Sequence, residues 1–175
     1  MDLTKDYFSN LGLPCRYQID MAALAKAHRQ LQQVHHPDRF AAGTDIEQRR
    51  AVQVAAYLNQ ANAVLRSPLR RAIYLLELLG MEPLAPTNTS MPMDFLLQQM
   101  QLRERMEAVP EAMDIETELE QMAAELLALH KQLQVEFATA YGDNQLQVAE
   151  VAVRKLQFID KLQQECNDLE GRLLD

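Results

Sequence analysis

The sequence predicts an all-α protein of two parts, an N-terminal helical hairpin and a C-terminal antiparallel three-helix bundle. Apolar residues recur at steps of three and four through most of the chain, which is the period of a helix with one buried face. Only five of the 175 residues are Gly and 48% are hydrophobic, as in a folded, helix-rich protein. Residues 81–92 contain three prolines and no periodicity, so they separate the two parts.

The charge distribution also divides the chain. Residues 1–74 carry ten Lys and Arg against six Asp and Glu, a net charge of +4, whereas residues 75–175 carry seven against nineteen, a net charge of −12. Such asymmetry suggests two units with different partners. We therefore predict domains at residues 1–75 and 93–175, joined by the end of a connecting helix and a linker at residues 76–92.

Two helices precede the first strong break in the pattern. A short helix is expected over residues 6–11, because apolar residues recur there at helical spacing and Gly12 follows. Asp20 is a good N-cap for a second helix that runs to residue 35. Pro37 then ends helical geometry, since it lacks an N–H group and restricts the residue before it.

The next two helices share a boundary. Thr44 and Glu47 form a capping-box pattern that starts a third helix, and Ser67 with the following proline stops it. Ser67 is also the expected N-cap of a fourth helix at residues 69–79, which Gly80 closes. The second and third helices, joined by a short loop, are expected to pack antiparallel with their apolar faces together.

The C-terminal half predicts three longer helices. Their expected ranges are residues 93–109, 115–141 and 144–174, with Pro110 and Gly142 at the ends of the first two. Leucines and other apolar residues at alternating steps of three and four run along the second and third of these helices. Short connections between such stripes predict an antiparallel bundle with packing like that of a coiled coil.

Two features stand out as candidate sites. The tripeptide His36-Pro37-Asp38 joins an imidazole, a rigid ring and a carboxylate at the tip of the hairpin, although such a tripeptide alone is also an ordinary turn. On residues 93–109, Leu96 and Met100 point away from the stripe that suits the bundle core. Either the rest of the chain covers them or they form a partner-binding patch, and Phe158 is either core or an exposed anchor.

The N-terminal motifs together resemble a J domain. The matching segments are Asp6-Tyr7-Phe8, Leu11-Gly12-Leu13, His36-Pro37-Asp38 and Leu58-Asn59-Gln60-Ala61, in the order that this module requires. The resemblance implies action on DnaK-type ATPase chaperones through the His-Pro-Asp loop and a basic face of the second helix. The chaperone-binding residues that it implies are His36, Pro37, Asp38, Lys26, Arg29 and Arg39.

Over its whole length the chain resembles the HscB family of J-domain co-chaperones. Tyr74-Leu75-Leu76, Phe95-Leu96, Leu102-Arg103-Glu104 and Phe158-Ile159-Asp160-Lys161-Leu162 carry this match. The resemblance implies stimulation of the chaperone HscA and delivery of the iron–sulfur scaffold protein IscU, with no cofactor and no enzyme activity of its own. The scaffold-binding residues that it implies are Leu96, Met100, Gln101, Arg103, Glu104 and Phe158.

Two departures from the family pattern change these expectations. The second helix is poorer in lysine than a general J domain, so docking should depend more on Lys26, Arg29 and Arg39. Gln101 replaces an acidic residue in the family pattern, which changes its share of the polar rim.

Other function classes fit the residues less well. An enzyme or zinc site would use His28, His35 and His36, but the first two lie seven residues apart, too far for the i, i+4 pairing of a helical zinc site. Nucleic-acid binding by the basic hairpin is disfavoured by the net charge of −8, and a small-molecule substrate has no motif to bind it. A J-domain adaptor for a different client remains the alternative.

The sequence also predicts the location of the protein. Cys15 and Cys166 lie far apart and in no CxxC motif, so we expect two reduced thiols and no metal site. We see no secretory signal and no stretch that would cross a membrane, so a cytoplasmic protein is expected.

Overall fold

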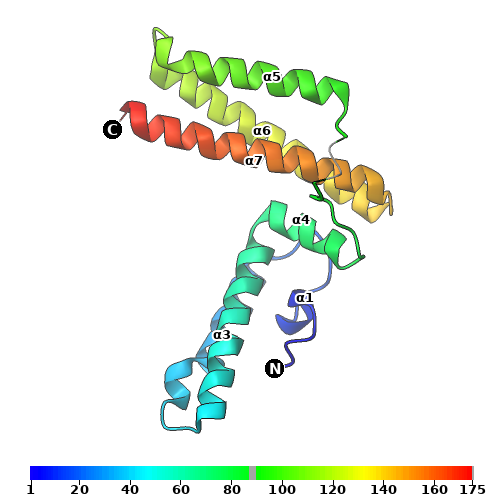
Figure 1. The fold of residues 1–175 in the computed structure, drawn as a ribbon, viewed down its shortest axis with the longest axis vertical. Coiled ribbons are helices and arrows are strands. Elements are labelled where there is room, and N and C mark those ends of the chain that lie inside the picture. The colour runs from blue at the N-terminus through cyan, green and yellow to red at the C-terminus, as the bar shows by residue number, and fades with distance from the viewer. Residues whose placement is uncertain (87–89, 175) are drawn as a thin grey trace. The chain divides into compact units, whose positions relative to one another are not determined.

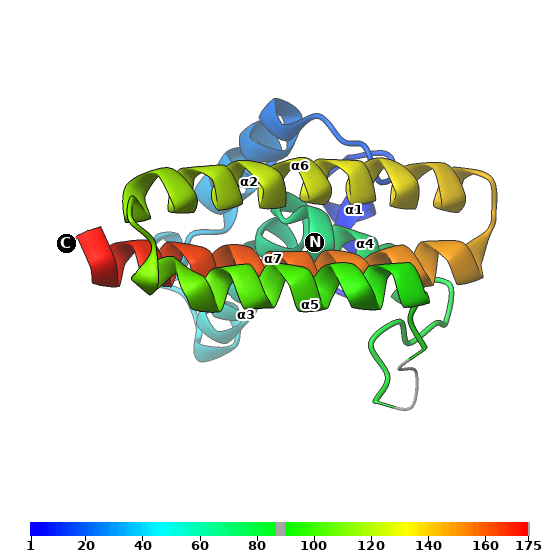
Figure 2. The same cartoon turned by 90° about the horizontal axis from the view of Figure 1, so that it is seen from above.

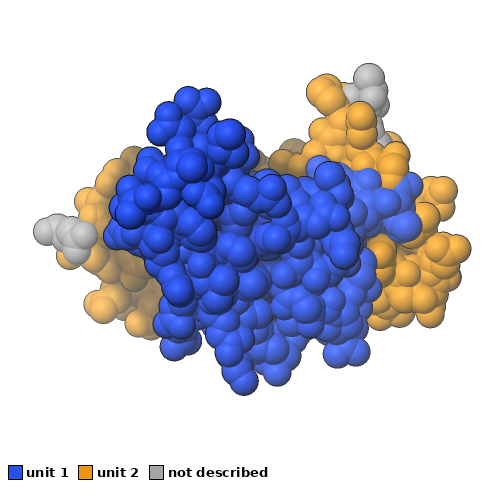
Figure 3. All heavy atoms as spheres, turned by 90° about the horizontal axis from the view of Figure 1, so that it is seen from below, with its two compact units in different colours: residues 1–79 blue, residues 80–175 orange. Residues whose placement is uncertain are grey.

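The computed structural model of the protein describes residues 1–86 and 90–174. Residues 87–89, which belong to the predicted linker, lie outside this described part, as does Asp175. Within it, every regular element is a helix, which confirms the all-α prediction. The chain divides into two compact units, unit 1 at Met1–Leu79 and unit 2 at Gly80–Asp175, coloured separately in Figure 3.

Unit 1 is organised around its longest helix. Its elements are α1 (Tyr7–Asn10), α2 (Met21–His35), the 3₁₀ helix η1 (Pro37–Phe40), α3 (Asp45–Arg66) and α4 (Pro68–Glu77). Helix α3 contacts each of the other four, and α2 lies antiparallel to it as the predicted hairpin (Figure 1). The tip of this hairpin is η1, at the end of α3 opposite to α4.

Side-chain caps start the helices of unit 1 where the sequence predicts them. Asp20 accepts hydrogen bonds from the N–H groups of Ala22 and Ala23, at 2.8 and 3.1 Å. Thr44 and Glu47 form the complete capping box, and Ser67 accepts from the backbone N–H of Arg70 at the start of α4. Each cap satisfies N–H groups that the first helical turn leaves without partners.

The core of unit 1 is apolar and rimmed by tyrosines. Its fully buried large side chains come from four helices and are Phe8, Leu24, Leu58, Leu65, Leu75 and Leu76. At the edge of this core the rings of Tyr7 and Tyr74 stack at 4.5 Å, and the Tyr74 hydroxyl accepts from the backbone N–H of Tyr7 at 3.0 Å. Helix α1 is thereby attached to α4.

One charged residue is buried in the same unit. The Arg71 guanidinium donates to the carbonyl oxygen of Leu65 and lies 5.0 Å from the centre of the Tyr17 ring. Burial lowers the pKa of Arg71, while Tyr17 opposes this shift. A buried charge needs such partners. Through them, Arg71 joins α4 to the end of α3 and to the loop before α2.

Unit 2 is the predicted antiparallel three-helix bundle. It consists of α5 (Met93–Ala108), a short 3₁₀ helix η2 (Val109–Glu111), α6 (Ile115–Gly142) and α7 (Leu146–Leu174), which run side by side in Figures 1 and 2. Helices α6 and α7 bury stripes along most of their lengths, including Leu126, Phe137, Leu156 and Ile159. Helix α5 buries only Phe95 and Leu102 fully.

Three predicted helix boundaries differ from those in the structure by one or two residues. Helix α6 includes Gly142, and the left-handed residue after it is Asn144, with a φ of 56°. Asn144 therefore belongs to the turn and α7 starts at Leu146 instead of residue 144. Helix α4 ends at Glu77, before the predicted residue 79, and Gly80 takes the left-handed conformation, with a φ of 78°.

A histidine is buried between the two long helices of unit 2. The Nδ1 atom of His130 lies 2.9 Å from the side-chain nitrogen of Gln134, and its Nε2 atom lies 4.0 Å from a carboxylate oxygen of Asp160 on α7. Burial lowers the pKa of His130, and the Asp160 charge partly opposes the shift. Burial in the bundle therefore favours the neutral form of this imidazole.

Truncation of the bundle core should destabilise unit 2. Leu126→Ala removes a fully buried side chain and should lower the free energy of unfolding by about 2 to 5 kcal/mol. Leu127→Ala, one residue on and 48% exposed, is the matched control and should change it by less than about 0.5 kcal/mol. Hydrogen exchange of α6 and α7 peptides in urea measures unit 2 alone, and equal effects of both variants would contradict the packing.

The buried histidine should make stability depend on pH. Because the pKa of His130 is lower in the folded protein, the unfolded chain binds more protons, and stability falls as pH drops below the unfolded pKa of about 6.5. His130→Gln should lose less stability than the wild type between pH 7.5 and 5. Urea midpoints across this range measure the difference, and identical losses would contradict the assignment.

Candidate functional site

The first candidate site is the hairpin tip, where a proline stops α2. His36 is extended, with φ of −62° and ψ of 131°, as expected of a residue before proline. Its Nδ1 atom accepts a hydrogen bond from the backbone N–H of Asp38 at 3.3 Å. The imidazole thus caps η1, and the tripeptide that the sequence singles out begins a short helix instead of an irregular turn.

The flanks of the tip hold it in place. The Arg39 guanidinium donates to the carbonyl oxygen of Gln33 at the end of α2, at 3.1 Å. The side-chain amide of Gln48 on α3 donates to the carbonyl oxygens of Ala41 and Gly43, each at 3.1 Å. Hydrogen bonds to α2 and from α3 therefore hold the segment that carries His36 and Asp38.

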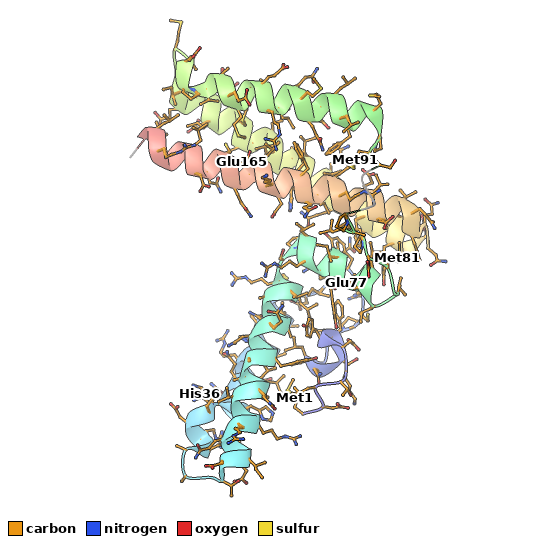
Figure 4. The ribbon with its side chains drawn as sticks, viewed as in Figure 1. Met1, His36, Glu77, Met81, Met91 and Glu165 are labelled. Carbon is orange, nitrogen blue, oxygen red and sulfur yellow. The ribbon has the colours of Figure 1, made fainter. Side chains whose placement is uncertain are left out.

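The polar side chains of the tip face solvent. The side chains of His36 and Asp38 are 56% and 89% exposed, and their Nδ1 and Oδ2 atoms lie 3.5 Å apart. Figure 4 shows His36 at the end of the hairpin that is far from α4. An exposed carboxylate held in this way is suited to a charge-assisted hydrogen bond with a cationic group of a partner.

The remaining residues predicted to bind the chaperone lie on α2 and in η1 and play different local roles. Lys26 and Arg29 are exposed on α2, earlier in the chain than the loop. Arg39 is exposed too, but its guanidinium is bonded back to α2. The structure therefore gives Arg39 a supporting contact that the sequence did not indicate.

The histidines of the rival metal-site interpretation do not come together. The Nε2 atom of His28 lies 3.3 Å from the side-chain oxygen of Asn59 on α3. His35 is half-buried, and burial lowers its pKa. Among residues 1–86 and 90–174, no three His, Cys, Asp or Glu side chains are grouped so that they could hold a metal ion.

The second candidate site lies on α5 and α7. Helix α5 turns Phe95 inward, whereas Leu96 and Met100 are 37% and 58% exposed. Arg103 lies one and two turns further along the same face, because residues spaced by three and four share a face. Its guanidinium sits 5.3 Å from the centre of the Phe158 ring of α7. We call Leu96, Met100, Arg103 and Phe158 the α5 patch.

Phe158 is half-buried at the seam between the two helices. Its ring meets that of Phe95 edge to face, with centres 6.0 Å apart. Arg103, besides covering this ring, lies 3.8 Å from a carboxylate oxygen of Glu165. Phe158 is therefore neither wholly core nor a free anchor, and its exposed part is fixed by its neighbours.

The two other residues predicted to bind the scaffold lie at the edge of this patch, on the flank of α5 that borders α6. Gln101 and Glu104 are exposed and line a hollow of about 440 Å³ that faces α6. The ion pair between Arg105 and Glu125 also lines this hollow. The structure thus brings four of the six predicted residues together in the α5 patch and sets Gln101 and Glu104 beside it.

Fold and sites together define a class of protein. A hairpin tipped by His-Pro-Asp, with an exposed basic α2, is a J domain, and here a helical bundle follows it in the same chain. A J domain joined to a second helical unit is the architecture of a co-chaperone.

Comparisons with known proteins identify the family. Residues 91–167 match the family model described as the HSCB C-terminal oligomerisation domain. The co-chaperone protein HscB homolog of Azoarcus sp. (strain BH72) is 43% identical over 169 residues, which are 96% of this chain and 95% of the relative. The chain belongs to the HscB family of co-chaperones, which confirms the resemblance seen in its motifs.

Solved structures agree with this assignment. Chaperone HscB from Vibrio cholerae superimposes with a TM-score of 0.87 at 34% identity, over 97% of this chain and 99% of that one. Human co-chaperone protein HscB gives a TM-score of 0.89 at 25% identity, over 97% of this chain and 84% of that one.

None of the helices in the described part of the chain is long and apolar enough to span a membrane.

Proposed function

We propose that this protein is a cytoplasmic co-chaperone that stimulates the ATPase of the DnaK-type chaperone HscA and delivers the scaffold protein IscU to it, in the maturation of iron–sulfur proteins. One observation carries the proposal: the chain presents a fixed, exposed His-Pro-Asp tip on unit 1 and a separate, partly apolar patch on unit 2. Two distinct surfaces suit an adaptor that binds two partners and performs no chemistry of its own.

The chaperone side of the proposal rests on charge. The Asp38 carboxylate, 89% exposed, would accept a hydrogen bond from an arginine of the ATPase unit. Lys26 and Arg29 on α2 would face an acidic surface and speed its encounter with unit 1. His36 and Arg39 would hold the loop in its binding conformation through the bonds described above.

The scaffold side rests on apolar contact. Leu96 and Met100 would enter the interface together with the exposed part of Phe158, while Arg103 would border them. Gln101 and Glu104 would contribute polar contacts from the neighbouring hollow. An exposed apolar patch bordered by polar groups is typical of a protein-binding surface.

Carrying both surfaces on one chain explains how the adaptor would work. A bound scaffold protein is brought close to the chaperone, which raises their effective concentration even if each contact is modest. Docking of the tip would favour ATP hydrolysis and shift the chaperone toward its client-holding state, through differential binding to the two states.

Neutralising Asp38 tests the chaperone contact. Asp38→Asn should abolish stimulation of the chaperone ATPase, because the amide no longer offers an ionised acceptor. Circular dichroism should be unchanged, since the side chain is exposed. A single-turnover ATPase assay measures the effect, and undiminished stimulation would refute the role proposed for this residue.

Truncating the α5 patch tests the scaffold contact. Leu96→Ala with Phe158→Ala should weaken scaffold binding by on the order of 1 to 4 kcal/mol for each anchor, while scaffold-independent ATPase stimulation persists. Isothermal titration with the scaffold protein measures this change. Met100→Ala, at a 58% exposed position, gives a second variant with little effect on the core, and Leu127→Ala on α6 is the control. Unchanged affinity in the patch variants would leave a different client as the better explanation.

A further inference from the structure

A largely buried lysine on α7 lies outside both candidate sites. The side chain of Lys155 is 15% exposed, and its ammonium donates to a carboxylate oxygen of Glu136 on α6 at 2.9 Å. The same ammonium lies over the Phe95 ring of α5, with its Nζ atom 5.7 Å from the ring centre. One positive charge on α7 therefore contacts both of the other long helices of the bundle.

A series of contacts links Lys155 to the α5 patch. The buried Phe95 ring meets the Phe158 ring at 82°, with centres 6.0 Å apart. The Arg103 guanidinium lies over the Phe158 ring on the other side of this pair. Two aromatic rings are thus flanked by two cations, one largely buried and one at the surface. Because cations attract the faces of aromatic rings, these contacts favour one orientation of each ring.

The Phe95 ring determines how the first turns of α5 lie. Phe95 and Leu102 are the buried side chains that hold this helix. Leu96 follows Phe95 directly, so a Phe95 ring fixed inward directs Leu96 outward. Arg154, beside Lys155 on α7, holds the same segment, because its guanidinium donates to the carbonyl oxygen of Ser90 at 3.2 Å, three residues before α5 starts.

Packing alone does not require a charge at this position. An ammonium loses hydration when it is buried, and an apolar side chain of similar length would fill the same space without that cost. The ion pair with Glu136 offsets the loss, but a well-packed apolar pair of similar volume is often as stable. What the ammonium of Lys155 adds is an attraction directed at the face of the Phe95 ring.

We infer that Lys155 is a positioning residue for the α5 patch. Its ammonium, anchored by Glu136, holds the Phe95 ring in place. That ring in turn fixes Leu96 and the exposed part of Phe158, so a scaffold protein meets both side chains already ordered and binding costs less conformational entropy. This inference rests on the proposed scaffold contact and deepens it, because it assigns part of the affinity to residues of α6 and α7 behind the patch.

Substitutions of Lys155 test the role of its charge. Lys155→Met keeps a long apolar side chain but removes the ammonium, whereas Lys155→Arg keeps a cation. Lys131→Met removes one positive charge from an exposed position of α6 and is the matched control. Each variant is titrated with the scaffold protein by isothermal titration, alone and combined with Phe158→Ala, at a temperature where circular dichroism shows it folded. If Lys155→Met does not fold, Glu136→Gln, which removes the anchor of the ammonium, takes its place with the same expected direction.

We expect Lys155→Met to raise the Kd for the scaffold protein about threefold to tenfold. In the Phe158→Ala background the same substitution should change the Kd by less than about twofold, because the contact that it supports is already gone. Lys155→Arg and Lys131→Met should bind within about twofold of the wild type. The inference is overturned if Lys155→Met leaves the Kd unchanged, if it raises the Kd equally in both backgrounds, or if Lys155→Arg binds as weakly as Lys155→Met.

Aromatic NMR spectra of the free protein give a readout that needs no scaffold protein. The ring resonances of Phe95 and Phe158 should both shift in Lys155→Met, because the cation that polarises and orients the first ring is gone. Both should stay in place in Lys131→Met. Unshifted Phe158 resonances in Lys155→Met would show that the charge does not reach the patch and would overturn the inference.

The outcomes also separate this inference from the proposed function. If the wild type itself does not bind the scaffold protein, the proposed function fails and the inference fails with it. If the wild type binds, the combined Leu96→Ala and Phe158→Ala variant does not, and Lys155→Met binds normally, only the role of Lys155 is refuted.

Discussion

Burial of one apolar face per helix is the constraint on which both units depend. In unit 1, α3 can bury Leu58 and Leu65 only against neighbours, and it contacts α1, α2, η1 and α4 to do so. Because α2 and α3 must lie antiparallel for this burial, the short segment between them projects from the end of the hairpin. The tip is thus exposed as a result of core packing, and its sequence is left free for binding.

The constraint explains why the fold could be predicted from the sequence. Helix starts have explicit side-chain signals, and Asp20, Thr44 and Ser67 form the caps that their positions predict. Helix ends have weaker signals. Gly142 was expected to end α6, yet the left-handed position falls on Asn144, which also tolerates that conformation. The backbone N–H groups of residues 143–145 then donate to the last carbonyl oxygens of the helix.

The sites were only partly predictable, because they depend on contacts between helices. The exposure of Asp38 follows from its place after a helix-stopping proline. That Arg39 would bond back to Gln33 depends on side-chain geometry that no spacing rule contains. Helical periodicity put Leu96 and Met100 on an outward face, but the edge contact of Phe158 with Phe95 and its cover by Arg103 need α7 beside α5.

The sparse burial of α5 has a thermodynamic consequence. This helix is held by few fully buried side chains, chiefly Phe95 and Leu102, whereas α6 and α7 bury stripes along most of their lengths. Segments with little buried apolar surface open at lower free energy than the rest of a fold. A partner that covers the outer face of α5 binds only its folded form, so mass action adds the binding free energy to the stability of that helix. Partner binding at the α5 patch therefore increases the folded fraction of α5, and a larger folded fraction of α5 increases partner binding.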